Sequence, residues 1–117
     1  MRRTILLIAM CAMLVSIVAP AAFAAEKVGN DRANYIKETC GADLLVGRGG
    51  NDTIDANNCG PDADRLRGGT GNDRLLANDG DVTDSVIGGP GYDTCVVDAR
   101  SEVDGGCERV LVREPSA

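Results

Sequence analysis

Gly68-Gly69-Thr70-Gly71-Asn72-Asp73-Arg74-Leu75-Leu76 is the stretch of this chain that decides its fold. Glycines at its first, second and fourth positions let the backbone take positive φ angles and turn its carbonyl groups toward a common centre. Its last three residues place one apolar side chain between two others, which is typical of a minimal strand with an inward-facing central residue. The stretch therefore predicts a tight glycine-rich loop that leads into a very short strand.

The same pattern occurs in two further segments, each with one substitution. Residues 47–55 carry Arg48 in place of the second glycine, and residues 88–96 carry Cys95 at the apolar position. Other short strand-like pieces are Thr53-Ile54-Asp55 and Arg65-Leu66-Arg67. Glycine recurs every few residues between them and would cost about 1 kcal/mol per site in a helix interior. Helix is therefore not expected in the repeat region.

Six aspartates, here called the pacing aspartates, recur in the repeat region at intervals of 9, 12, 9, 11 and 9 residues. An apolar or thiol side chain follows each of them two residues later. The aspartates are Asp43, Asp52, Asp64, Asp73, Asp84 and Asp93, and the residues two positions later are Leu45, Ile54, Leu66, Leu75, Val86 and Cys95. Every second aspartate recurs after 20 or 21 residues, so we expect the chain to wind and its carboxylates to stack. Carboxylates about 5 Å apart repel by roughly 0.8 kcal/mol even in water, which makes calcium the first hypothesis for a ligand.

These repeats resemble the haemolysin-type, or repeats-in-toxin (RTX), calcium-binding nonapeptide GGxGxDxUx. Residues 68–76 match every defined position of that motif. The resemblance implies an all-β fold, a short right-handed parallel β-roll (β-solenoid) in which two nonapeptides make one turn. It implies about three turns for this chain, with calcium bound between successive loops on each side.

The resemblance also divides the repeats between two edges of the roll. One edge, here called the glycine edge, has well-preserved loops and is expected to bind strongly. The other, here called the degenerate edge, keeps only the aspartate and the apolar residue and is expected to bind weakly. The expected metal-site residues are Asp52, Asp73, Asp93, Gly50, Gly69, Gly71, Gly89 and Gly91 on the glycine edge, and Asp43, Asp64 and Asp84 on the degenerate edge.

Calcium takes six to eight oxygen ligands from carboxylates and carbonyls, which two stacked loops can supply together. We predict two well-formed sites, between Asp52 and Asp73 and between Asp73 and Asp93, and up to two weaker ones on the degenerate edge. The additional carboxylates Asp62, Asp79 and Asp81 either compensate there for missing glycines or are ordinary solvated residues, and the sequence leaves both readings open. Because the ion offsets carboxylate repulsion, we expect calcium binding to be coupled to folding, with an affinity of about 0.1–1 mM.

The N-terminal residues 1–24 have the features of a signal peptide. A short positive start is followed by the apolar run 5–18, and Ala22-Phe23-Ala24 fits the small-x-small cleavage rule. The apolar run is shorter than the roughly 20 residues that span a membrane. We therefore expect cleavage after Ala24, secretion to the extracellular space and no membrane association afterwards.

The remaining chain is expected to contain one small domain in three parts. These are an N-terminal cap at residues 25–39, the calcium-binding β-roll repeats at residues 40–98, and a C-terminal cap and tail at residues 99–117. Loss of the signal peptide removes two arginines and no acid, which changes the formal charge from −6 to −8. Such an acidic chain is a poor partner for nucleic acid. Aromatic residues make up only 3% of the sequence, so a conventional core would be thin.

Four cysteines follow the signal peptide, and an even number in a short exported chain indicates two disulfides. A zinc site is disfavoured because the chain has no histidine and no closely paired cysteines. Three pairings exist in principle. The stacked-turn model favours Cys40–Cys59, which are about one turn apart, and Cys95–Cys107, which would join the last repeat to the C-terminal cap. The ends of the roll are then clamped by disulfides.

The leading hypothesis for function is a secreted, non-enzymatic calcium-binding protein that resembles small exported bacterial calcium-repeat proteins. The chain has no histidine and no Gly-x-Ser-x-Gly motif, which disfavours an enzyme. An EF-hand around Gly80 is rejected because it would place Leu75 and Ala77 at ligand positions. The alternative is a calcium-stabilised adhesion or interaction module at the cell surface, with a protein partner that the sequence does not identify.

Overall fold

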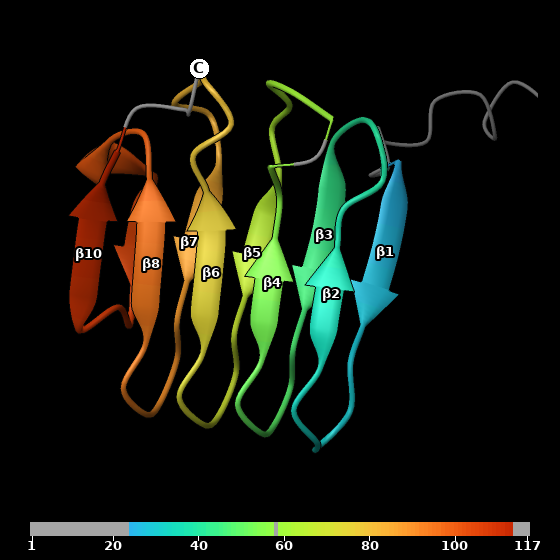
Figure 1. Cartoon of the computed structure of the whole chain (residues 1–117), viewed down its shortest axis with the longest axis vertical. Coiled ribbons are helices and arrows are strands. Elements are labelled where there is room, and N and C mark those ends of the chain that lie inside the picture. The colour runs from blue at the N-terminus through green and yellow to red at the C-terminus, as the bar shows by residue number, and fades with distance from the viewer. Residues whose placement is uncertain (1–23, 58, 114–117) are drawn as a thin grey trace, which may run out of the picture.

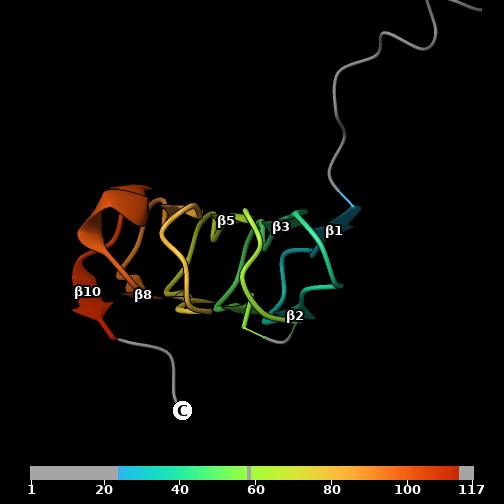
Figure 2. The same ribbon diagram turned by 90° about the horizontal axis from the view of Figure 1, so that it is seen from above.

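The chain folds into a parallel β-solenoid made of two facing sheets (Figures 1 and 2). The computed structural model describes residues 24–57 and 59–113. One sheet contains, in spatial order, β1 (Ala25–Val28), β3 (Asp43–Val46), β5 (Arg65–Arg67), β7 (Ser85–Ile87) and β9 (Val103–Gly105). The other contains β2 (Tyr35–Lys37), β4 (Thr53–Asp55), β6 (Arg74–Ala77), β8 (Thr94–Val97) and β10 (Arg109–Val112). Successive strands alternate between the sheets, so each consecutive pair forms one turn.

The expected all-β solenoid is confirmed, and the expected strands at residues 53–55 and 65–67 coincide with β4 and β5. Within the described residues, helical structure is limited to the short 3-10 segment η1 (Arg100–Glu102). None of the described helices is long and apolar enough to cross a membrane. The expected signal peptide lies, apart from Ala24, outside the described residues.

The expected number of three turns is wrong, because the roll has five. The segments 25–39 and 99–117, interpreted as caps, each supply a pair of strands. β1 and β2 pair in parallel with β3 and β4, and β9 and β10 pair with β7 and β8. Their loops lack most defined positions of the nonapeptide, so the motif does not reveal them, although their backbones can still extend the parallel ladders.

The core consists of two columns of inward-facing side chains, one from each sheet. Parallel register aligns Lys27, Leu45, Leu66, Val86 and Val103 in the first column, and Ile36, Ile54, Leu75, Cys95 and Val110 in the second. The six residues that follow the pacing aspartates are completely buried. Ala56, Ala77 and Val97 are also completely buried and belong to the same core, so β6 and β8 each bury more than one apolar side chain.

The two ends of this core are closed differently. At the N-terminal end, Lys27 takes a core position and its Nζ donates a hydrogen bond to the Lys37 carbonyl oxygen of the facing sheet at 2.6 Å. Cys40 and Cys59 join neighbouring turns by a disulfide with a Cα–Cα distance of 5.1 Å. At the C-terminal end, a second disulfide connects Cys95 with Cys107, whose Cα atoms are 6.0 Å apart. Both ends are therefore held covalently.

Candidate metal centre

The loops between the sheets form the two edges of the roll (Figure 1). The glycine edge carries the compact, similar loops that lead from the first sheet to the second, at residues 29–34, 47–52, 68–73, 88–93 and 106–108. The degenerate edge carries the more irregular return loops, at residues 38–42, 56–57 with 59–64, 78–84 and 98–102. The structure places Asp52, Asp73 and Asp93 on the first edge and Asp43, Asp64 and Asp84 on the second.

All six pacing aspartates are buried, with at most 6% of their surface exposed. Each lies at or directly before the first residue of a strand. Aspartate is rarely buried to this extent unless its charge is compensated. Their burial therefore raises the question of what satisfies the carboxylates.

One oxygen of most of these carboxylates is satisfied by the neighbouring turn. Oδ1 of Asp73 accepts a hydrogen bond from the Asp52 amide at 2.8 Å, and Oδ1 of Asp93 accepts one from the Asp73 amide at the same distance. The degenerate edge repeats this arrangement, since Asp64 accepts from the Asp43 amide and Asp84 from the Asp64 amide, both at 2.8 Å. Each edge thus contains a ladder in which an aspartate caps the turn before it.

The glycine-edge ladder extends beyond the three aspartates that the sequence pattern identified there. The Asn34 amide donates to Asp52 Oδ1, and the Asp93 amide donates to Glu108 Oε1. On the degenerate edge, Glu102 Oε2 accepts hydrogen bonds from the Asp98 and Ala99 amides of its own turn, both at 2.8 Å. Asn34 and Glu108 escaped the prediction because they are not aspartates. The signal that could have found them is their spacing, two residues before Ile36 and Val110.

The second oxygen of five aspartates has no hydrogen-bond partner although it is buried. These orphaned atoms are Oδ2 of Asp52, Asp64, Asp73, Asp84 and Asp93. A buried carboxylate oxygen without a partner is costly in a protein interior. A bound cation is a physical means of removing this cost on both edges.

In the loops 47–52, 68–73 and 88–93, the first glycine creates a space beside such an oxygen. A Cβ atom at Gly68 would lie 2.5 Å from Asp73 Oδ2 and 2.6 Å from the carbonyl oxygen of Gly88 in the next turn. The equivalent spaces are bounded by Asp52 Oδ2 and the Gly68 carbonyl at Gly47, by Asp93 Oδ2 and the Gly106 carbonyl at Gly88, and by Asn34 Oδ1 and the Gly47 carbonyl at Gly29. A side-chain oxygen and a carbonyl from neighbouring turns converge at each position. This hard oxygen set is the kind that calcium prefers.

The predicted glycines keep these loops stacked in close contact. Gly71 has a φ of 103°, and a Cβ there would collide with the Gly50 carbonyl oxygen of the preceding turn. Gly50, Gly69, Gly89 and Gly91 also have positive φ angles. Arg48 takes the place of a motif glycine at a φ of 78°, so this loop keeps the geometry despite its substitution. The prediction omitted Gly47, Gly68 and Gly88, although they are the glycines that border the orphaned oxygens.

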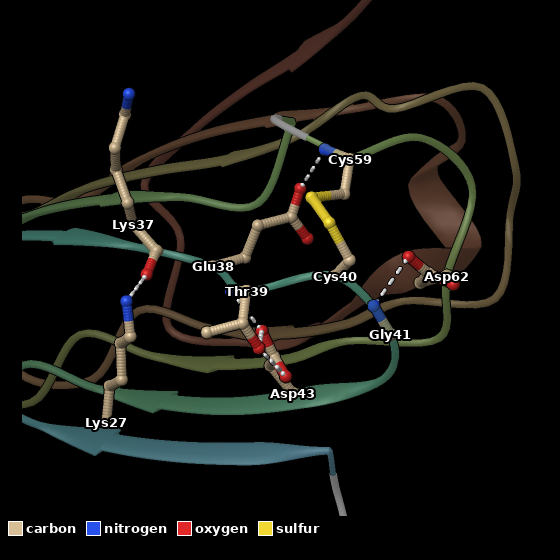
Figure 3. The surroundings of a disulfide bond; sticks show 9 residues. All are labelled: Lys27, Lys37, Glu38, Thr39, Cys40, Gly41, Asp43, Cys59 and Asp62. Atoms are coloured by element: carbon tan, nitrogen blue, oxygen red, sulfur yellow. Dashed lines mark hydrogen bonds between the residues drawn. A yellow bond between two sulfur atoms is a disulfide. The ribbon is translucent and has the colours of Figure 1, made fainter.

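The degenerate edge surrounds its aspartates with further carboxylates. Ligand atoms of three groups lie within 4.8 Å of one another: Glu38, Asp43 and Asp64; Asp64, Asp79 and Asp84; and Asp81, Asp84 and Glu102. Glu38 and Glu102 were not singled out from the sequence, since neither belongs to the nonapeptide. Asp62 is outside these groups and instead accepts a hydrogen bond from the Gly41 amide at 3.1 Å (Figure 3).

Asp43 differs from the other five aspartates because the protein satisfies both of its oxygens. The Thr39 amide donates to Oδ2, and the Thr39 hydroxyl lies 2.9 Å from both oxygens (Figure 3). In the same region, the Cys59 amide donates to Glu38 Oε1 at 2.8 Å. Protein donors therefore satisfy Oδ2 of Asp43, whereas Oδ2 of Asp84 has no donor.

Burial raises the pKa of five ladder aspartates, Asp52, Asp64, Asp73, Asp84 and Asp93. Burial, followed by the negative charges of Asp93 and Asp52, raises the pKa of Asp73 to about 6. On the degenerate edge, burial is again the largest cause and raises the pKa of Asp64 and of Asp84 to about 8. Neighbouring carboxylates add to the shift of both groups, Glu38 and Asp43 for Asp64, and Asp79, Asp64 and Asp81 for Asp84. Because burial disfavours the charged form of these carboxylates, binding of either a proton or a cation would stabilise both edges.

Comparison with known families and proteins adds one finding. The family described as RTX calcium-binding nonapeptide repeat (4 copies) matches residues 41–59 and 60–95. Neither the curated proteins nor the solved structures contain a match to this chain. The matched residues hold the six aspartates and the glycine-edge loops at residues 47–52, 68–73 and 88–93 described above. Residues 41–95 of this chain belong to the haemolysin-type (RTX) calcium-binding repeat family.

Proposed function

We propose that this chain is a secreted, non-enzymatic calcium-binding β-roll that folds when Ca²⁺ binds between successive loops of its glycine edge. The observation that carries the proposal is the row of buried, orphaned Oδ2 atoms, each beside a main-chain carbonyl of the next turn. One ion would be held by the loops of Asp52 and Asp73, and a second by those of Asp73 and Asp93. Calcium would supply charge neutralisation there, while the chain supplies the oxygens.

Coupling to folding follows from the electrostatics of the ladder. Without a cation, the fold must keep buried carboxylates either protonated or in mutual repulsion, as the raised pKa of Asp73 reflects. In the unfolded chain the same groups are solvated and far apart. A cation that binds only the folded state therefore stabilises it increasingly as its concentration rises above the dissociation constant.

The extracellular location is supported by the signal-peptide pattern of residues 1–24 and by the two disulfides. Sites of about 0.1–1 mM affinity belong to the range found in extracellular calcium-binding modules. Such sites would be filled outside the cell and largely empty at the low calcium levels of a cytosol. Folding would then be completed after export.

The test is a calcium titration of the oxidised chain that begins at Ala25, monitored by far-UV circular dichroism at pH 7.4. We expect a coil-like spectrum in chelator that becomes β-like at submillimolar to millimolar calcium. Magnesium should be ineffective at the same concentrations, because it needs near-ideal octahedral geometry and gives up its water reluctantly. A spectrum that calcium leaves unchanged would contradict coupled folding.

A further inference from the structure

The degenerate edge contains a chain of carboxylates that the repeat motif does not account for. Two groups of three share Asp84: Asp64 and Asp79 lie on one side of it, and Asp81 and Glu102 on the other. Asp79 and Asp81 come from the loop 78–84, on either side of Gly80, which has a φ of 113°. Glu102 ends η1 in the following turn. The groups therefore bridge three consecutive turns.

Buried oxygens without partners belong to these groups. Asp84 Oδ2, Asp64 Oδ2 and Glu102 Oε1 are inaccessible to solvent and accept no hydrogen bond. Their residues are 6%, 2% and 1% exposed, respectively. Asp79 and Asp81 are half-buried. Exposed acidic loops also place carboxylates close together, but they leave all of the oxygens to water, whereas here the named oxygens of Asp64, Asp84 and Glu102 are shielded from it.

We propose that the degenerate edge binds two further Ca²⁺ ions, one on each side of Asp84, through sites built from side-chain carboxylates. Asp64, Asp79 and Asp84 hold the first ion, and Asp81, Asp84 and Glu102 hold the second. In these sites the carboxylates of the loop residues Asp79 and Asp81 and of Glu102 take the place of the main-chain carbonyls that glycines orient on the other edge.

The charge of the groups favours a hard divalent cation such as calcium. Ligands at calcium–oxygen distances of 2.3–2.6 Å lie at most about 5 Å apart across the ion. The ligand atoms of each group all lie within 4.8 Å of one another, so one calcium ion can reach them together. Three carboxylates, each able to bind through one or both oxygens, supply between three and six ligands, and water completes the shell.

The third carboxylate group is not included, because both oxygens of its ladder aspartate Asp43 are satisfied by protein donors. Both oxygens of Asp43 accept hydrogen bonds from Thr39, and Glu38 accepts one from the Cys59 amide. Asp43 and Asp84 thus occupy equivalent places on the degenerate edge but differ in their hydrogen bonds. Oδ2 of Asp43 accepts a hydrogen bond from Thr39 and needs no cation. Oδ2 of Asp84 accepts none and is available to bind a cation.

In the two proposed groups the ladder aspartate Asp84 therefore keeps an orphaned oxygen. The flanking Asp79 and Asp81 accept main-chain hydrogen bonds there, Asp79 from the Asp62 and Asp81 amides and Asp81 from the Thr83 amide.

The proposal can be tested independently of the glycine edge, because one aromatic residue lies in a glycine-edge loop. The sequence has two tyrosines and no tryptophan, and the described aromatic side chains are Tyr35 and Tyr92. Tyr92 precedes Asp93 in the glycine-edge loop 88–93, whereas Tyr35 lies on β2 and its hydroxyl donates a hydrogen bond to Asp55 at the other end of β4. All variants are therefore made in a Tyr35→Phe background. Terbium luminescence excited through Tyr92 then reports glycine-edge binding, while equilibrium dialysis with radioactive calcium counts the ions on both edges.

The decisive variants are Asp79→Asn and Asp81→Asn, alone and combined. Neither residue belongs to a ladder, and the amide of the Asp81→Asn variant retains an oxygen that can accept from the Thr83 amide and hydroxyl. We expect each single variant to bind one calcium ion fewer than the wild type and the double variant two fewer. Tyrosine-sensitised terbium luminescence should stay unchanged in all three. Asp104→Asn, an exposed change of the same charge on β9, is the control and should bind as many ions as the wild type.

A double variant that binds as much calcium as the wild type would overturn the proposal. Loss of terbium luminescence together with calcium would mean that the variant no longer folds, and Glu102→Gln then decides the matter. That variant should lose one ion and keep the luminescence, and unchanged binding would again contradict the proposal. A wild type without sensitised luminescence, whose double variant still loses two ions, would refute the glycine-edge sites and leave those on the degenerate edge.

Discussion

The two edges of the roll hold the same aspartate ladder but surround it with different chemistry. On the glycine edge, each Oδ2 faces a main-chain carbonyl of the next turn, and glycines bring the loops together. On the degenerate edge, Asp84 is surrounded by carboxylates from its own loop and from neighbouring turns. The repeating part of the sequence therefore fixes one buried carboxylate per half-turn. The remaining oxygens can come from either the backbone or side chains.

The loops of the two edges also differ in length. Steps that cross the glycine edge are always 9 residues, whereas steps across the degenerate edge are 12 and 11 residues. At Gly71 and Gly91 the glycine-edge loops stack so closely that no Cβ would fit against the previous turn. At Gly60 on the degenerate edge nothing lies within 4 Å of the Cβ position. Insertions are tolerated where loops do not have to stack.

The largest expected effect that separates the edges is the response of the metal-free protein to pH. The raised pKa values, about 8 for Asp64 and Asp84 and about 6 for Asp73, lie above that of an unfolded aspartate, about 3.9. The resulting stabilisation is complete below the unfolded value and is lost as the pH rises through the folded values. In chelator, the β-like circular dichroism should therefore increase as the pH falls from 8 to 5.

Matched variants assign this pH response to an edge. Asp84→Asn removes the charge from the group with the higher pKa and should restore more β-like signal at pH 8 in chelator than Asp73→Asn does. Equal gains, or a larger gain for Asp73→Asn, would contradict the difference between the edges.

The next effect concerns the stacking of the loops. Gly71 and Gly60 have φ angles of 103° and 102°, so an alanine is strained by about 1–2 kcal/mol at either position. Only at Gly71 does the new Cβ also collide with the backbone of the preceding turn, which adds about 1–3 kcal/mol. Urea unfolding at saturating calcium should show Gly71→Ala as clearly less stable than Gly60→Ala. Similar losses would show that close stacking does not distinguish the edges.

The two disulfides should stabilise the roll by similar amounts through loop closure. Their loops span 19 and 12 residues, which correspond to about 3 kcal/mol each in the chain-entropy model. Cys95 is completely buried, whereas Cys40 and Cys59 are exposed. The pair Cys95→Ala and Cys107→Ala should therefore cost more in urea unfolding than the pair Cys40→Ala and Cys59→Ala. The reverse order would show that the clamp on the degenerate edge matters more than the core column.

The smallest effect is a difference in calcium affinity. Asp73 belongs to both proposed glycine-edge sites, while Asp43 is satisfied by Thr39. Asp73→Asn should weaken calcium binding about tenfold or more, equivalent to about 1.4 kcal/mol, because a charged ligand is lost. Asp43→Asn should change it by less than about threefold, as measured by calorimetric titration. Equal losses would contradict the separation of the two edges.

Much of the fold was predictable because its signals are local and periodic. The apolar residue two positions after each aspartate became part of the core columns, from Leu45 to Cys95. The first and last turns were missed because Asn34 and Glu108 replace the aspartate, and Lys27 stands where an apolar residue was expected. At these ends, hydrogen bonds to the neighbouring turn define the strands rather than the motif.

The candidate site was predictable to the same extent. The sequence indicated the aspartates and the glycines at positive φ, such as Gly71. It did not indicate that Gly68 leaves the space beside Asp73, or that Glu102 joins Asp81 and Asp84. Glu102 is 18 residues away from Asp84 in the sequence, outside any repeat position, and only the winding of the chain brings the two together.

By itself, the sequence determined the solenoid, its two edges and the carboxylate at each half-turn, because a fixed spacing of glycine, aspartate and apolar residues specifies one winding geometry. The tertiary structure decided which oxygens remain unsatisfied. Asp43 and Asp84 occupy equivalent repeat positions, yet both oxygens of Asp43 are satisfied by a threonine, whereas Oδ2 of Asp84 is left without a partner among acidic neighbours. Whether an oxygen finds a partner depends on the side chains that the stacking of turns places around it. Those side chains come from neighbouring turns and lie outside the nonapeptide motif.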